Sequence, residues 1–173
     1  MKTVPLYGKV AAGRVALVDD ADYDLMMQHR WNVQERTRPN GSKIGPYAFT
    51  SVCGSGRTVI VWMHRLILPG VSQVDHEDGD GLNNQRSNLR PATNLQNHAN
   101  ERKTRTNRGR PTSSRFKGVY WSKLERKWKA QIQTTGYKQG LGTFTDEAEA
   151  ARAYDAAARE AFGEFARVNF PCP

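Results

Sequence analysis

The sequence predicts an α+β protein of two small domains, each combining an antiparallel sheet with a helix. Short stretches of alternating apolar and polar residues, separated by turns rich in Gly and Asn, predict strands in the first part of the chain. A second group of strand-like segments over residues 116–144 precedes an alanine-rich helical segment. Because 173 residues suffice for two small domains, we expect one over residues 1–100 and another over residues 116–173.

The charge balance favours a polyanionic partner. The chain has 26 Lys and Arg against 17 Asp and Glu, a net charge of +9, which suits nucleic acid or an anionic membrane. The longest apolar candidate, residues 58–68, is interrupted by His64 and Arg65 and falls short of the roughly 20 residues that span a bilayer. Cys53 and Cys172 lack a CxxC spacing, which argues against a disulfide framework and a zinc cluster. We expect a reduced, cytoplasmic, nucleic-acid-binding protein without a signal peptide.

The N-terminal region predicts a small antiparallel sheet whose role is to present the segment that follows it. Residues 1–18 predict a β-hairpin with Val15 and Leu17 facing the core. Asp19 or Asp20 can then cap a helix over residues 21–28. Further strands are expected at three places, residues 31–34, 47–52 and 58–63.

An acidic loop over residues 74–89 stands out in this basic chain. It contains Asp75 and His76 side by side, with further carboxylates and amides around them. Clusters of Asp, Gly and Asn are often only polar hairpin loops, but oxygen ligands beside an imidazole suit a hard cation and a general base. A helix should follow, because Thr93 and Gln96 have the spacing of a capping box. The order is then strand or hairpin, loop and helix, a ββα unit.

The pattern VDHEDGD–NN–NLR–AT–QN resembles the HNH endonucleases, specifically the phage and intron-encoded homing enzymes. The resemblance implies a ββα-metal core over about residues 60–100. By position it implies that His76 is the general base and that Asp75 and Asn97 are metal ligands. It also implies that Asn88 joins the two limbs of the loop as part of the catalytic motif.

The same resemblance implies the chemistry and the partners. We expect one divalent cation, Mg²⁺ or Mn²⁺, and no small-molecule cofactor. The substrate would be double-stranded DNA, in the cytoplasm of a bacterial or phage-infected cell. A monomer is expected in preference to an obligate dimer. The target sequence, and nicking as against double-strand cleavage, stay open.

Several assignments in this region stay open as well. The third motif residue can be His or Asn, and His98 neighbours Asn97; adjacent helix positions point about 100° apart, so only one can face a metal. The spacing within the motif favours Asn97. His64 fits a hydrogen-bonded structural residue or a ligand, and Arg86 and Arg90 fit phosphate contacts or solvated surface charge.

Residues 101–115 predict a basic linker. They include six Lys or Arg, one Glu and no apolar side chain, a composition that does not form a packed element. An extended segment of this kind could follow a DNA backbone or remain solvated.

The C-terminal region predicts a three-stranded antiparallel sheet packed on one helix. In KWKAQIQ, the apolar residues Trp128, Ala130 and Ile132 alternate with Lys and Gln. The helix that covers this apolar face should begin with Thr145 as its cap and end at Gly163.

The segments KGVYW, KWKAQI, LGTF, EAARAYDAAAREAFGEFAR and VNFP resemble the APETALA/ethylene-response-factor DNA-binding domain. The resemblance implies a sheet that enters the major groove. The plant domains carry Arg or Trp at several strand positions where this chain differs, so the fold should carry over but not the target sequence; these positions are Lys117, Tyr120, Gln131, Gln133 and Gly140. The expected DNA contacts are Arg115, Lys117, Tyr120, Trp121, Lys123, Arg126, Lys127, Lys129, Gln131, Gln133 and Lys138. A packed aromatic is the alternative for Trp121.

Taken together, the sequence predicts a metal-dependent DNA endonuclease of the homing or mobile-element type, targeted by a C-terminal DNA-binding sheet. Two alternatives belong to other classes. One is a non-catalytic DNA-binding regulator with a degenerate HNH fold. The other is an RNA-binding or structural module whose acidic loop binds only a stabilising cation.

Overall fold

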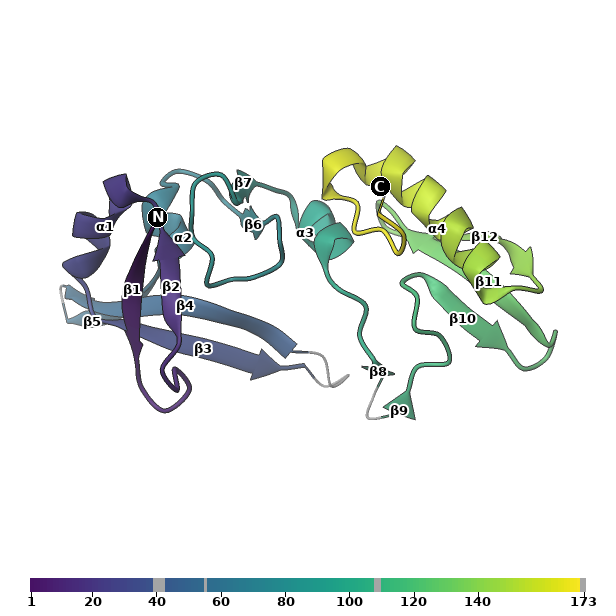
Figure 1. The fold of residues 1–173 in the computed structure, drawn as a ribbon, viewed down its shortest axis with the longest axis horizontal. Coiled ribbons are helices and arrows are strands. Elements are labelled where there is room, and N and C mark those ends of the chain that lie inside the picture. The colour runs from purple at the N-terminus through teal and green to yellow at the C-terminus, as the bar shows by residue number, and fades with distance from the viewer. Residues whose placement is uncertain (39–42, 55, 108–109, 172–173) are drawn as a thin grey trace. The chain divides into compact units, whose positions relative to one another are not determined.

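The computed structural model describes residues 1–38, 43–54, 56–107 and 110–171, so Cys172 lies outside the described residues. These residues form two compact units: unit 1 comprises residues 1–38 and 43–92, and unit 2 begins at Thr93. Each combines helices with β-strands (Figure 1). The predicted α+β class is confirmed. No helix in the described part of the chain is long and apolar enough to cross a membrane.

Unit 1 contains a five-stranded sheet in the order β2-β1-β3-β4-β5. Its strands are β1 (Lys2–Tyr7), β2 (Val15–Val18), β3 (Trp31–Thr37), β4 (Lys43–Gly54) and β5 (Arg57–Trp62). The expectation of a purely antiparallel sheet is wrong at one pair, because β1 and β3 run parallel, with Leu6 opposite Trp31. The helix α1 (Asp20–Met27) makes this pairing possible, since it carries the chain from β2 back to the other edge of β1.

The inward face of β2 is the opposite of the predicted one. Ala16 and Val18 are fully buried, whereas Val15 is 42% exposed and Leu17 is only partly buried. Ala16 lies opposite Val4 on β1, which is itself buried. Directly opposed residues on paired strands share a face, so the pairing with β1 decides which alternate residues of β2 enter the core.

The core of unit 1 also anchors the acidic loop. The helix α2 (Met63–Ile67) packs on β4 and β5 and buries Met63 and Ile67. A short antiparallel hairpin follows, formed by β6 (Val74–His76) and β7 (Leu89–Pro91). Leu82 from the intervening loop and Leu89 from β7 are buried in the same core. The loop is therefore tied to the core at its middle as well as at its ends.

Unit 2 begins with α3 (Asn94–Asn100) and a small hairpin, β8 (Thr106–Asn107) and β9 (Arg110–Pro111). The capping box predicted for α3 is confirmed: Thr93 Oγ1 accepts from the Gln96 amide, and Gln96 Oε1 accepts from the Thr93 amide. The strands β6 and β7 and the helix α3 follow one another in the expected order. Because α3 belongs to unit 2, a ββα-metal module stays a prediction.

The rest of unit 2 is a three-stranded antiparallel sheet with α4 (Glu147–Phe162) along one face (Figure 1). Its strands are β10 (Val119–Ser122), β11 (Lys127–Gln133) and β12 (Lys138–Phe144), and the 3-10 turn η1 (Gly163–Phe165) follows α4. The predicted end of α4 at Gly163 is confirmed, with a positive φ of 53°. The predicted cap is wrong by one residue: Asp146, not Thr145, accepts the hydrogen bond from the Glu149 amide.

Close packing and a buried carboxylate hold the sheet and α4 together. A Cβ at Gly118 would lie 1.9 Å from Cδ2 of Tyr154, so only Gly allows this approach. The buried Asp155 accepts hydrogen bonds from the Asn169 amide at 2.7 Å and from the Phe170 amide at 2.8 Å. The Asn169 side chain in turn accepts a hydrogen bond from the Lys117 amide and donates one to the Lys117 carbonyl. The C-terminal segment is thereby fixed to the start of the sheet.

Candidate functional site

The acidic loop between β6 and β7 is held by the side chain of Asn88. Its Oδ1 accepts from the Asp78 amide at 3.0 Å, and its Nδ2 donates to Asp78 Oδ1 at 3.0 Å and to the Asn83 carbonyl at 2.8 Å. Asn83 Nδ2 also donates to Asp78 Oδ2 at 2.8 Å. Burial raises the pKa of the Asp78 carboxyl, but hydrogen bonds from the Asp80 amide and the two Asn side chains outweigh it and lower that pKa. Asp78 therefore helps to shape the loop.

The loop also contacts the main sheet of unit 1 directly. Its backbone pairs with β2: the Leu17 amide donates to the Leu82 carbonyl at 2.9 Å, and the Asn84 amide donates to the Leu17 carbonyl at 2.8 Å. A Cβ at Gly81 would lie 2.3 Å from the Pro46 carbonyl oxygen. The loop backbone thus lies against β4, where no larger residue fits without displacement.

His76 lies in an enclosed, largely aromatic environment. It is 5% exposed, and its ring centroid lies 5.2 Å from that of His64 and 5.7 Å from that of Tyr47. Its Nε2 is 3.4 Å from Asn84 Oδ1. Burial lowers the pKa of His76, and the Asn84 contact and the carboxylates of Asp78 and its neighbours oppose this only in part. The imidazole is therefore neutral at neutral pH, the state that can accept a proton.

Two residues beside His76 were not among the predicted site residues. His64, left open between a structural residue and a ligand, stacks on Trp62 at 6.2 Å with an interplanar angle of 9°. Burial lowers the pKa of His64 to about 3, and the neighbouring His76 and Arg65 act in the same direction. Asn84 is fully buried against His76. The Asn pair of the sequence pattern was the available signal for Asn84, but nothing local in the sequence places His64 there.

Asp75 forms a buried ion pair. It is 7% exposed, and its Oδ2 accepts from Arg90 Nε at 3.0 Å, with Nη2 of the same guanidinium at 2.9 Å. Arg86 is likewise paired, donating to both carboxylate oxygens of Asp22 at 2.8 Å. The sequence fits either phosphate contacts or solvated charge for both arginines, and in the structure both have a carboxylate partner within unit 1.

The predicted second ligand, Asn97, lies on α3 in unit 2. Asn97 is partly buried, whereas the neighbouring His98 side chain is 61% exposed and its Nδ1 lies 3.1 Å from Glu101 Oε1. Asp75 and Asn97 thus belong to different units, and their pairing around a metal stays a prediction.

The donor set determines what kind of metal site is possible. Among the described residues, no group of three or more His, Cys, Asp and Glu could hold a metal ion by itself. A carboxylate from Asp75 and an amide oxygen from Asn97 are nevertheless the hard donors that Mg²⁺ and Mn²⁺ accept. The donor types suit such a cation, and a site formed by the two residues stays a prediction.

The face of the unit 2 sheet opposite α4 is basic and polar. Val119, Ala130 and Ile132 are buried on the α4 side, so alternate positions project away from the helix. Tyr120 lies opposite Lys129 across the strand pair, and other predicted contacts share their face. The predicted contacts on this face are Tyr120, Lys127, Lys129, Gln131, Gln133 and Lys138.

Trp121 lies on the other face of the sheet. It is directly opposite Trp128, and the two rings pack edge to face with centroids 5.0 Å apart. Trp121 is still 36% exposed. Three further predicted contacts, Lys123, Arg126 and Arg115, are exposed outside the strands. DNA contacts by all these residues stay predictions.

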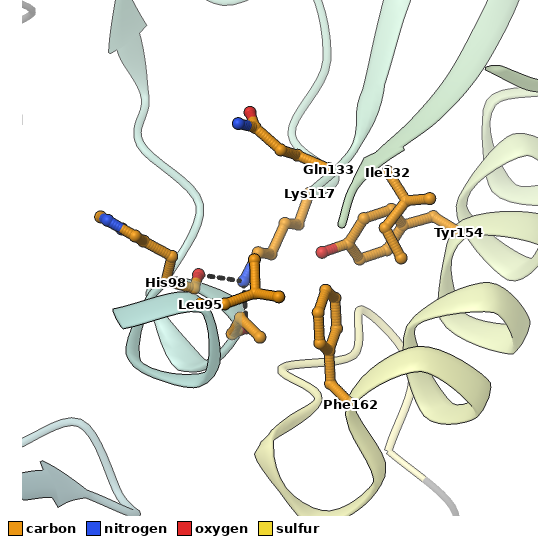
Figure 2. Close-up of a pocket in the computed structure, with 8 residues that line it drawn as sticks. Leu95, His98, Lys117, Ile132, Gln133, Tyr154 and Phe162 are labelled. Atoms are coloured by element: carbon orange, nitrogen blue, oxygen red, sulfur yellow. Dashed lines mark hydrogen bonds between the residues drawn. The ribbon is translucent and has the colours of Figure 1, made fainter. Parts of the chain in front are cut away.

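Lys117 is directed at the end of α3. Its Nζ donates to three main-chain carbonyls, those of His98 at 3.3 Å, Ala99, and Glu101 at 2.7 Å. Figure 2 shows the bond to His98. Burial lowers the pKa of Lys117 to about 8, although the Glu101 charge acts in the opposite direction. Its contact with DNA stays a prediction.

Comparison with known proteins shows partial similarity to two kinds of protein. An uncharacterized HNH endonuclease of Acanthamoeba polyphaga mimivirus is 39% identical over 103 residues, which is 59% of this chain and 49% of that protein. The dehydration-responsive element-binding protein 2A of Arabidopsis thaliana is 44% identical over 68 residues, 37% of this chain and 20% of that protein. An AP2/ERF and B3 domain-containing protein of Oryza sativa subsp. japonica is 49% identical over 59 residues, 34% of this chain and 16% of that protein.

Each similarity covers only part of this chain and part of the other protein. The chain spans about half the length of the mimivirus protein and a fifth or less of each plant protein. No family model matches the chain. The partial similarities to an HNH endonuclease and to AP2/ERF proteins fit a chain with a two-part layout.

Proposed function

We propose that this protein is a metal-dependent DNA endonuclease of the homing type, with a nuclease part and a sheet-type DNA-binding part. The observation that supports it most is the state of His76. This imidazole is 5% exposed, has a lowered pKa and neighbours Asp75 in a loop held by Asn88. The partial similarity to an HNH endonuclease supports the same reaction class.

In this proposal His76 takes the proton from the attacking water. An amide oxygen only accepts hydrogen bonds, so the contact between His76 Nε2 and Asn84 Oδ1 favours the tautomer with its proton on Nε2. Nδ1 then carries the lone pair that acts as the general base. Asn88 keeps the loop, and with it His76, in position.

Asp75 and Asn97 would hold the divalent cation, Mg²⁺ or Mn²⁺, which when bound stabilises negative charge on the phosphate and on the leaving oxygen. Arg90 orients the Asp75 carboxylate through the hydrogen bond to Oδ2. This arrangement resembles the support that polar neighbours give to ligating carboxylates.

The sheet of unit 2 would bind the DNA. Its outward Lys residues suit phosphate oxygens, and Gln131 and Gln133 suit the hydrogen-bonding edge of adenine in the major groove. The similarity to AP2/ERF proteins supports this role. Phosphate contacts would position the chain, and the Gln side chains would contribute sequence preference.

One observation favours a second candidate function, a non-catalytic DNA-binding regulator. Asp75 is already neutralised by Arg90, and a buried, paired carboxylate has less charge to offer a cation. In a regulator of this kind the loop would be structural, and only the sheet of unit 2 would act.

A plasmid nicking assay with Mg²⁺ or Mn²⁺ distinguishes the two. We expect the wild type to relax supercoiled plasmid, chelation to stop it, and His76→Ala to lower the rate by about 100-fold or more. His29→Ala, in the same unit but outside the loop, is the matched control and should cleave normally. Full activity of His76→Ala would remove the proposed base. Salt-sensitive DNA binding without cleavage under any condition would favour the regulator.

A further inference from the structure

The helix α3 is built into unit 2, although it carries a residue of the proposed nuclease site. Ala99 is buried, its carbonyl accepts from the Arg167 amide at 3.2 Å, and α3 packs on η1 and α4. A helix of seven residues is not stable by itself. Packing on η1 and α4 therefore contributes to its conformation.

Lys117 adds a charged donor at the C-terminal end of α3, where the His98 and Ala99 carbonyls also accept from the Glu101 and Arg167 amides. The last carbonyls of a helix have no partner within the helix, and a positive charge there is favourable. Lys117 Nζ donates to the carbonyls of His98, Ala99 and Glu101. An ammonium has three N–H donors, and these three carbonyls use all of them. A lysine in this arrangement has no remaining donor for a DNA phosphate.

The aliphatic part of Lys117 lines a pocket in unit 2. Leu95 on α3 and Tyr154 and Phe162 on α4 line the same pocket (Figure 2). A long methylene stem can lie along apolar surface while its charged end reaches polar partners. Hydrogen bonds to three carbonyls hold the ammonium at the end of α3.

The main chain of Lys117 is equally fixed. Its amide donates to Asn169 Oδ1 at 2.6 Å, and its carbonyl accepts from Asn169 Nδ2 at 3.1 Å. Asn169 is bonded to the buried Asp155 of α4. A continuous set of hydrogen bonds thus runs from α4 through Asn169 and Lys117 to the end of α3.

We propose that Lys117 is a positioning residue: by fixing α3 it sets the orientation of Asn97, so the DNA-binding unit also holds one ligand of the nuclease cation. This inference rests on the proposed function for the role of Asn97. It assigns Lys117 a different role from the sheet lysines, which are free of α3 and face away from α4. Unit 2 would then contribute to cleavage as well as to target binding.

The test compares Lys117→Met with Lys127→Met in the full chain. Methionine keeps most of the stem length but has no donor, and Lys127 lies on the exposed face of β11. We expect Lys117→Met to speed amide hydrogen exchange in residues 94–100 by about tenfold. We also expect a several-fold rise in the Mn²⁺ concentration needed for half-maximal nicking. DNA affinity in chelator and its salt dependence should match the wild type.

Lys127→Met should behave in the opposite way. Its exchange in residues 94–100 and its Mn²⁺ requirement should stay at the wild-type values. Loss of one phosphate contact should lower DNA affinity and reduce the slope of log affinity against log salt by about 0.9. The two variants therefore separate a positioning role from a phosphate contact.

Three results would overturn the inference. One is unchanged exchange in α3 with a reduced salt slope, which would make Lys117 a phosphate contact. Another is faster exchange in α3 with an unchanged Mn²⁺ requirement. The third is hydrogen exchange in residues 94–100 that stays at the wild-type rate in both variants. If the wild type cleaves no DNA, the proposed function fails, and the exchange rates alone still decide whether Lys117 holds α3. Should circular dichroism show that Lys117→Met unfolds unit 2, Lys117→Arg keeps the charge, changes the donor geometry and is judged by the same results.

Discussion

Replacing Asn88 with Ala should destabilise unit 1 far more than the few atoms removed from the side chain suggest. The side chain is buried and makes two hydrogen bonds with uncharged main-chain groups and one with the Asp78 carboxylate. A neutral hydrogen bond contributes about 1 kcal/mol and one to a charged group about 1.5–3 kcal/mol. Asn88→Ala should therefore lower the free energy of unfolding of unit 1 by about 4 kcal/mol.

The measurement needs to separate the two units. Hydrogen–deuterium exchange followed by mass spectrometry in a urea series gives the stability of each segment. We expect a large loss in residues 74–91 and no change in residues 116–165. Asn83→Ala is the matched control in the same loop. It removes the bond to Asp78 Oδ2 at 2.8 Å and a longer one to the Gln85 amide, and should cost about 2 kcal/mol.

The relative size of the two effects is decisive. If Asn88→Ala costs no more than Asn83→Ala, Asn88 does not join the two limbs of the loop in solution. If exchange in residues 116–165 changes equally, the two units unfold together and the assay does not isolate the loop. In the first case the structural basis for a positioned His76 would be lost.

Two further predictions concern pH and packing. His64 has a pKa of about 3 in the folded protein against 6.5 for an unperturbed imidazole, so the unfolded chain binds the extra proton first as pH falls. The contribution of neutral His64 to the free energy of unfolding is complete above pH 6.5 and falls by up to about 1.4 kcal/mol per pH unit towards pH 3. The urea midpoints at pH 7 and pH 5 should therefore differ less in His64→Phe than in wild type. An equal difference in the two proteins would contradict this. Gly118→Ala should lower the melting temperature of unit 2 markedly, because its Cβ would lie 1.9 Å from the Tyr154 ring and φ is 77°, at a cost of about 2–4 kcal/mol. Gly140→Ala, with no atom within 4 Å of its Cβ, should change little, and equal losses in both would refute the packing argument.

The sequence alone determined the features that depend on local spacing. The alternation in β11, the capping box at Thr93 and the end of α4 at Gly163 were all predictable, because each is decided by residues a few positions apart. Asp75 and His76 are adjacent in the chain, so their proximity needed no structure. The α+β class follows from the same local patterns.

The tertiary structure decided the features that depend on partners far apart in the sequence. Alternation in β2 showed that every second residue is buried, but pairing with β1 selected Ala16 and Val18. The parallel pairing of β1 with β3 depends on the path of the chain through α1. His64 lies beside His76 only because α2 and β6 pack on one core.

Long charged side chains show most clearly that the local sequence does not determine which partner a residue contacts. Composition identified Arg90 and Lys117 as basic, but not the direction in which they point. Several rotatable bonds separate the charge from the backbone, so a nearby buried carboxylate or a helix end decides its position. The structure directs Arg90 to Asp75 and Lys117 to the last carbonyls of α3. Basic residues that look alike in the sequence are thereby divided between holding the fold and facing solvent, because only the folded chain brings their partners within reach.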